Sequence, residues 1–165
     1  MLQNGLIYPY LNKVEIYKCP ADTKTVIGPA GKNSNHSKHV HEYMDESPSN
    51  MVTTPTPLIY RKQTAIDSPS MRWVLIDENP FSINDGMLVC DPNSKSWVDI
   101  PASYHNGAGG LSFADGHAEI KKWRDSNVLN CKAPPPAGGG TPQDASTGDL
   151  AWLQERSTTP ASTTP

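Results

Sequence analysis

The sequence has no long uninterrupted hydrophobic run, and only 36% of its 165 residues are hydrophobic. A helix that spans a bilayer needs about 20 consecutive apolar residues, so no transmembrane segment is predicted. No apolar stretch of the kind found in a secretory signal peptide follows Met1 either. The formal net charge of -3 argues against a nucleic-acid partner, because such partners usually require a basic face.

Motifs that define the common enzyme classes are also missing. The sequence contains no P-loop, no Rossmann glycine pattern, no nucleophile elbow and no HExxH helix. Its cysteines, Cys19, Cys90 and Cys131, form no C-x-x-C pair, which excludes a zinc ribbon and a thioredoxin-type motif. An odd number of cysteines fits one disulfide with one thiol or three reduced thiols, so the pairing stays open.

Proline and glycine, in contrast, are abundant at 16 and 12 residues, and they divide the chain. The composition predicts one globular β-domain, a Pro/Gly linker, a docking C-terminal segment and a disordered tail, over residues 1–131, 132–148, 149–156 and 157–165. The docking segment contains Leu150, Trp152 and Leu153, and it is expected to form one or two amphipathic helical turns.

Within the domain, short strands separated by long loops are predicted. The apolar run Trp73–Ile76 is typical of a central strand that is covered on both faces. Weaker patterns predict a strand at Val14–Tyr17 and another near Val40–Met44. The expected fold class is therefore α+β, mainly β, with a small antiparallel sheet and long loops.

A hairpin is predicted over residues 111–120. Asp115-Gly116 is favoured in a two-residue type I′ turn, because both central positions of that turn need a positive φ. This turn would pair Leu111 with Ile120 and Phe113 with Ala118, which gives one apolar face. The other face would then carry Ser112, Ala114, His117 and Glu119.

Four segments resemble one protein family in their order along the chain. They are Tyr8–Leu11 with Cys19-Pro20-Ala21-Asp22, then Ser68-Pro69-Ser70 before Val74–Glu78, then His105 followed after nine residues by Asp115-Gly116, and finally Asp149–Leu153 with Arg156. Over residues 6–156 they resemble the prepilin-type H-X9-DG proteins, which are pilin-like and related to the pseudopilins of type II secretion.

This resemblance implies the globular C-terminal region of a pseudopilin, a structural role in assembly, and an extracellular or periplasmic parent protein. Family members begin with a basic leader and a long apolar helix, and the sequence is expected to represent the globular region without them. A sheet face that the helix would cover is then expected to be exposed. We expect the chain to self-associate as a homo-oligomer to cover it.

A small hydrolase acting on carbohydrate is the alternative from another class. Asp77 and Glu78 end the central strand, and either could pair with Asp115 or Glu119 at the spacing of about 5 to 9.5 Å that glycosidases use. The glycines after His105 would let the backbone turn sharply, so that His105 lies over the hairpin near Asp115 or His117. These residues would then form an acid–base or metal site. A purely structural interpretation is that Asp115 stabilises the turn itself and that His105 forms a hydrogen bond to the backbone.

Exposed Trp and Tyr residues could stack on sugar rings, so a module that binds carbohydrate or metal without turnover is a third alternative. No cofactor is certain, and two divalent ions are candidates. His36, His39 and His41 could ligate zinc, although an exposed polar loop explains them as well. Carboxylates that suit calcium follow in a later loop at Asp85, Asp91 and Asp99.

Overall fold

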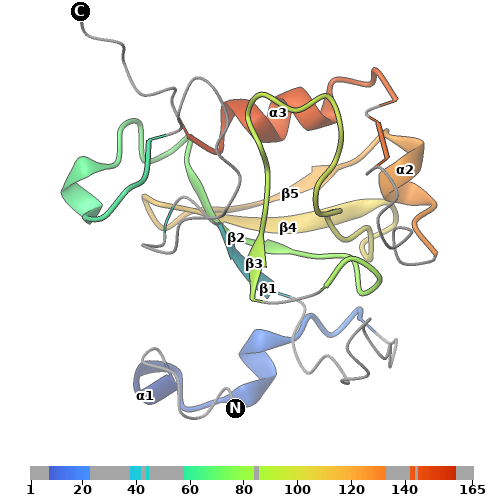
Figure 1. The fold of residues 1–165 in the computed structure, drawn as a ribbon. Helices are drawn as coiled ribbons and strands as arrows, with labels where there is room; N and C mark the ends of the chain where they lie inside the picture. Colours follow the sequence, from blue (N-terminus) through green and yellow to red (C-terminus); the bar gives the residue numbers. More distant parts are fainter. Residues whose placement is uncertain are drawn as a thin grey trace, which may run out of the picture.

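The computed structural model describes residues 8–22, 38–41, 44, 58–83, 86–132, 142–143 and 145–158. Its centre is a five-stranded sheet in the order β3-β1-β2-β4-β5 (Figure 1). The strands are β1 (Lys38–His41), β2 (Trp73–Asp77), β3 (Met87–Leu88), β4 (Ala108–Phe113) and β5 (Ala118–Lys122). All neighbours are antiparallel except β1 and β3, which are parallel.

The helices are short. They are α1 (Tyr8–Leu11), the 3-10 turns η2 (Val14–Tyr17) and η4 (Gln63–Ala65), α2 (Ser126–Leu129) and α3 (Asp149–Glu155). This confirms the expected α+β, mainly β class with a small sheet and long loops. Among the described segments, no helix has the length and apolarity required to cross a bilayer, and α3 has only 7 residues.

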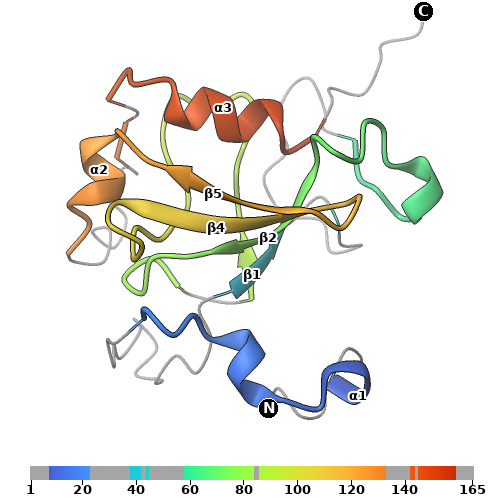
Figure 2. The ribbon, with the colours of Figure 1, turned by 180° about the vertical axis from the view of Figure 1, so that it is seen from behind.

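One face of the sheet carries the hydrophobic core, and α3 packs over it. Figures 1 and 2 show α3 on this side of the sheet and α1 on the other. The core is rich in large side chains, which gain most from leaving water; they include Trp73, Ile76, Leu88, Trp97, Ile100, Leu111, Phe113, Trp123, Val128, Leu150 and Leu153. The predicted helical turns at 149–156 are confirmed by α3, whose Leu150 and Leu153 are buried.

The hairpin is confirmed, but its predicted register is wrong by one residue. Ser112 lies opposite Ala118, and Leu111 lies opposite Glu119 instead of Ile120. The backbone N–H of Gly116 donates to the Phe113 carbonyl over 2.9 Å, and Gly116 has φ 93°. The loop therefore has three residues, with a turn followed by a left-handed glycine, and this extra residue shifts the pairing.

The new register moves Ile120 to the opposite face, where it is 69% exposed. Leu75 of the central strand is also 36% exposed there, so the prediction that this strand is covered on both faces is wrong. The Val14–Tyr17 strand is wrong as well, because those residues form η2. The sheet thus has one closed apolar face and one that is partly open.

Two described residues of the segment predicted as a linker lie against the domain. The Pro142 carbonyl accepts a hydrogen bond from the Trp97 backbone N–H over 2.9 Å, and Gln143 forms a β-bridge with Ser96. The Gln143 carbonyl also accepts from the side chain of Asn127 over 2.7 Å. These contacts hold residues 142–143 against the domain shortly before α3 begins.

Candidate functional site

Titratable side chains converge at the end of β2. The chain after β2 turns and returns alongside it: the Asn79 N–H donates to the Ile100 carbonyl over 2.8 Å, and the Ala102 N–H donates to the Asp77 carbonyl over 2.7 Å. This second passage places His105 beside Asp77. Asp77 is 1% exposed, whereas His105 is exposed to solvent.

The glycines after His105 act differently from the expectation. Gly107 has φ 82° and provides the turn that follows His105. Gly109 lies in β4, where an added Cβ would be 2.7 Å from the Ala102 carbonyl oxygen. A Cβ on Gly110 would lie 3.2 Å from a carboxylate oxygen of Asp77. These residues let the returning chain and the Asp77 carboxylate approach β4, so His105 reaches β2 and not the hairpin.

The third member of the cluster is Cys19, from the segment after η2. Its Sγ lies 3.3 Å from Nε2 of His105. Within the described part of the chain, Cys19, Asp77 and His105 form the one group of three whose potential metal-ligating atoms all lie within 4.8 Å of one another. Cys19 and Asp77 are buried, and His105 faces solvent. The structure therefore assembles a Cys/Asp/His set that could hold a metal ion.

Sequence reasoning found two members of this set and missed Cys19, which it treated as one of three unassigned thiols. A signal was present, because Cys19 opens the Cys19-Pro20-Ala21-Asp22 motif. That motif forms a turn in which the Asp22 N–H donates to the Cys19 carbonyl over 2.9 Å. The turn leaves both side chains buried.

Negative groups gather around the cluster. Burial raises the pKa of Tyr104, and the nearby Asp22 and Asp77 carboxylates raise it further. The Tyr104 hydroxyl donates to the backbone carbonyl of Glu78 over 3.1 Å. A cation reaches this region in the ion pair between Lys18 and Asp22, whose N–O distance is 3.9 Å. The carboxylates of Asp22 and Asp77 therefore both lie close enough to Tyr104 to disfavour its ionised form.

Glu78 does not take part. Successive strand residues point to opposite faces, and the Glu78 carboxylate accepts a hydrogen bond from the Ser82 hydroxyl. That hydroxyl also accepts from the Ile100 N–H over 3.0 Å. Glu78 therefore fixes the loop that follows β2, while Asp77 alone shares a site with His105.

Asp115 and His117 lie at the tip of the hairpin. Asp115 accepts hydrogen bonds from the His117 N–H over 3.1 Å and ring Nδ1 over 2.6 Å, and these two contacts lower its pKa. The His117 ring stacks on Phe113 with centroids 4.3 Å apart. Ile76 is opposite Leu111 and Asp77 lies beside Gly110, so three residues of β4, about 10 Å, separate Asp77 from Phe113, where the hairpin tip begins.

That separation corrects the sequence hypothesis of a joint site. A glycosidase pair needs carboxyl groups about 5 to 9.5 Å apart, so Asp77 and Asp115 do not form one. The nearest partners of Asp115 and His117 are each other and Phe113. Their contacts stabilise the turn.

The geometry does not test the histidine hypothesis, and it gives other partners to two of the calcium candidates. His36 and Asp85 lie outside the described residues, and so do the side chains of His39 and His41, whose backbone lies in β1. Asp91 accepts from the Asn93 N–H over 2.8 Å, and Asp99 accepts from the Val89 N–H over 2.7 Å. The last two carboxylates stabilise their own loop.

The tryptophans provide no open stacking surface. Trp73, Trp97 and Trp123 are at most 2% exposed. Trp152 is partly buried, and its ring is flanked by Lys121 Nζ at 4.9 Å and the Arg156 guanidinium at 4.2 Å. The expectation of exposed tryptophans is therefore wrong, and the carbohydrate ligand stays a prediction.

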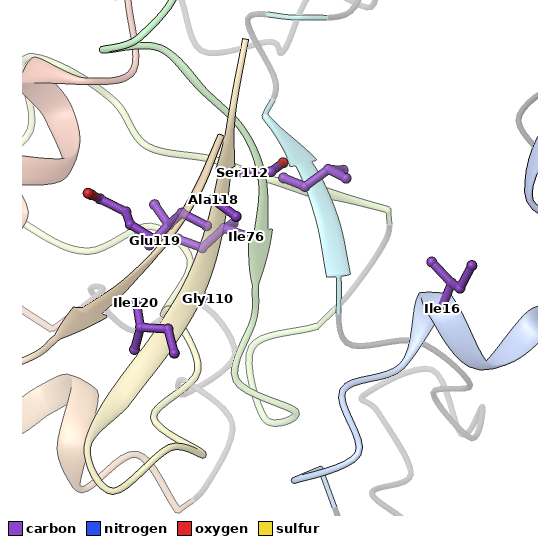
Figure 3. A pocket seen from close by; sticks show the side chains of 9 residues that line it. Ile16, Ile76, Gly110, Ser112, Ala118, Glu119 and Ile120 are labelled. Atoms are coloured by element: carbon purple, nitrogen blue, oxygen red, sulfur yellow. The ribbon is translucent and has the colours of Figure 1, made fainter. Parts of the chain in front are cut away.

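The open face of the sheet is hollowed into a groove of about 450 Å³. Figure 3 shows Ile16 of η2 on one side and the side chains of Ala118 and Ile120 on the hairpin strand. The groove is lined mainly by aliphatic groups and glycine backbone: Ile16, Leu75, Ile76, Gly110, Leu111, Ser112, Ala118, Glu119 and Ile120. Ile16 is 44% exposed and Ile120 is 69% exposed, so the groove is open to a partner.

Comparisons with models of protein families, with curated proteins and with solved structures find no match for this chain.

Proposed function

We propose that this chain is the globular part of a pilin-like or pseudopilin-like secretion or surface protein, and that it acts by assembly. The observation that carries this proposal is the apolar groove on the open face of the sheet. The ordered motifs that resemble the H-X9-DG proteins support it independently. Pilin-like subunits need an apolar surface against which a helix or a neighbouring subunit packs.

The groove suits such a contact because its aliphatic side chains come from separate elements. Ile16 belongs to η2, Leu75 to β2 and Ile120 to β5. Full burial of one such side chain stabilises a contact by about 1.5–3 kcal/mol. In the isolated chain the occupant is a second copy, because association would remove three partly exposed aliphatic side chains from water at once.

The hydrolase alternative is less well supported. Its pairing of Asp77 or Glu78 with Asp115 is not assembled, because Asp115 is bonded to His117 at the hairpin tip and Glu78 to Ser82 on the other face. His105 and Asp77 do meet, but their third neighbour is a thiol. A carbohydrate-binding role also lacks an open tryptophan platform.

Between the two divalent cations that the sequence leaves open, the arrangement favours zinc. Calcium takes six to eight oxygen ligands, whereas thiolate and imidazole are typical zinc ligands. Asp91 and Asp99 bind backbone N–H groups, and the Cys19/Asp77/His105 set offers one sulfur, one oxygen and one nitrogen. An assembly domain could use such an ion for structure.

Sedimentation equilibrium over a wide concentration range tests the assembly proposal. The unmodified chain should associate, and Ile120→Lys should remain monomeric, because a charge would have to enter the apolar contact. Leu129→Lys is the matched control. Leu129 lies on α2 and is 40% exposed, but it does not line the groove.

The control should associate as the unmodified chain does. Circular dichroism should show that both variants are folded, since both side chains are substantially exposed. A monomeric unmodified chain at every concentration would count against the proposal. So would equal association of the Ile120→Lys variant.

A further inference from the structure

Three chain segments that are far apart in the sequence meet at the Cys19/Asp77/His105 cluster. Cys19 comes from the segment after η2, Asp77 from the end of β2, and His105 from the loop before β4. Each side chain offers a different ligand atom, and all three atoms lie within 4.8 Å of one another. The close approach of Gly109 to Ala102 and of Gly110 to Asp77 makes this meeting possible.

The distance between Cys19 and His105 agrees with tetrahedral coordination. Zinc binds thiolate, imidazole and carboxylate at about 2.0–2.3 Å, so two ligand atoms on one ion are about 3.3–3.6 Å apart. Cys19 Sγ and His105 Nε2 are separated by 3.3 Å. A carboxylate oxygen of Asp77 lies within 4.8 Å of both atoms, so it would have to approach by at most about 1.5 Å for all three to share one ion.

A thiol–imidazole hydrogen bond alone would explain the contact between Cys19 and His105. It does not account for the carboxylate of a third segment that lies within reach of the same two atoms, whereas one metal ion ligated by all three side chains does. The exposed His105 leaves a path by which the ion could enter.

We propose that Cys19, Asp77 and His105 bind one zinc-like divalent ion, which fastens the segment of η2 and Cys19 to the sheet. Water from the solvent side would complete the tetrahedron. Because the ligands come from three segments, the free energy of binding contributes to folding of the N-terminal region. The same segment carries Ile16, so the ion also positions one wall of the groove. The metal site does not depend on the assembly role.

Cobalt(II) is the probe, because a thiolate ligand gives it an ultraviolet charge-transfer absorption. The metal-free 165-residue chain is titrated with Co²⁺ and then with Zn²⁺, alongside His105→Gln and Cys19→Ser. Matched controls are His117→Gln, at the hairpin tip, and Cys131→Ser, which is partly buried beside the core. A triple His36→Gln/His39→Gln/His41→Gln variant tests the rival histidine site.

One equivalent of Co²⁺ should give the thiolate band, and Zn²⁺ should abolish it. Cys19→Ser should lack the band, and His105→Gln should bind at least about 100-fold more weakly, since even outer-shell partners contribute about 10- to 100-fold. His105 is exposed, so His105→Gln should stay folded by circular dichroism. The controls and the triple variant should bind normally.

Absence of the band in the unmodified chain overturns the proposal. Retention of the band in Cys19→Ser, or its loss in the triple histidine variant, also overturns it. Tryptic cleavage after Lys13 and Lys18 tests the fastening role, and Zn²⁺ should slow it in the unmodified chain but not in His105→Gln. Equal cleavage with and without Zn²⁺ would refute that role.

Discussion

Asp149 is the residue that ties α3 to the end of β5. Its carboxylate is fully buried, and it accepts hydrogen bonds from the N–H groups of Arg124 and Asp125. The Lys121 ammonium lies 3.0 Å from the same carboxylate. Asp149 also opens α3, where a negative charge interacts favourably with the helix dipole.

Asp149→Ala should therefore lower the free energy of unfolding by about 3 kcal/mol, because it leaves buried donors unsatisfied. Urea denaturation followed by tryptophan fluorescence measures this change. Glu155→Ala is the control on the same helix, and it should cost at most about 1 kcal/mol because the Glu155 side chain is 68% exposed. A similar loss in both variants would contradict this role of Asp149.

The pKa of Asp149 gives this contribution a pH dependence. Burial alone would raise the pKa, but the Arg124 and Asp125 N–H groups and Lys121 outweigh it and lower the value. A lowered folded-state pKa means that the stabilisation is present above the unfolded value of about 3.9 and is lost as the pH falls through the folded value. The difference between Asp149→Ala and the unmodified chain should thus shrink below about pH 4.

Single residues also show what sequence reasoning could find. Asp77 and His105 were identified because titratable groups at a strand end and after a loop are visible in the sequence. The sequence pairs each of them with the hairpin and not with the other, because the return of residues 100–105 along β2 leaves no local pattern. Cys19 was missed for the same reason, since it lies 86 positions before His105 in the sequence.

At the scale of elements, the hairpin shows how turn length decides the faces of a sheet. Asp115-Gly116 fits a two-residue turn, and that turn predicts one fully apolar face of the hairpin. The observed three-residue loop places Glu119 opposite Leu111 and leaves Ile120 on the open face. A one-residue slip exchanges the two faces of a strand, so β5 could not be assigned correctly from alternation alone.

Gly109 is the element-scale test of the close contact between β4 and the returning chain. Gly109→Ala should lower the free energy of unfolding by about 1–3 kcal/mol, because the new Cβ would meet the Ala102 carbonyl oxygen at 2.7 Å. Gly86→Ala is the matched control. No atom of the described residues would lie within 4 Å of a Cβ at this position, so its effect should stay within about 0.5 kcal/mol.

Thermal or urea unfolding of both variants measures these effects. If Gly109→Ala were as stable as the control, the returning segment would not be packed against β4 as described. The position of His105 beside Asp77 would then also be in doubt, because both depend on this approach.

At the scale of the whole molecule, the fold class followed from composition, turn residues and the run Trp73–Ile76, and all three are local signals. The division of the sheet into a closed and an open face did not follow, because it depends on which side α3 covers. Leu75 illustrates the difference, since it was expected to be buried and is 36% exposed in the groove. The open face is the feature on which the assembly proposal depends.

The most direct test of that proposal is methyl NMR of the 165-residue chain across a concentration series. Signals of Ile16, Leu75 and Ile120 should shift together as the chain associates, because these side chains line the groove. Leu58 and Leu129 are internal controls, exposed at 38% and 40% but outside the groove, and their signals should stay in place. Signals that do not move with concentration, or shifts centred on Leu58 and Leu129, would contradict assembly through the open face of the sheet.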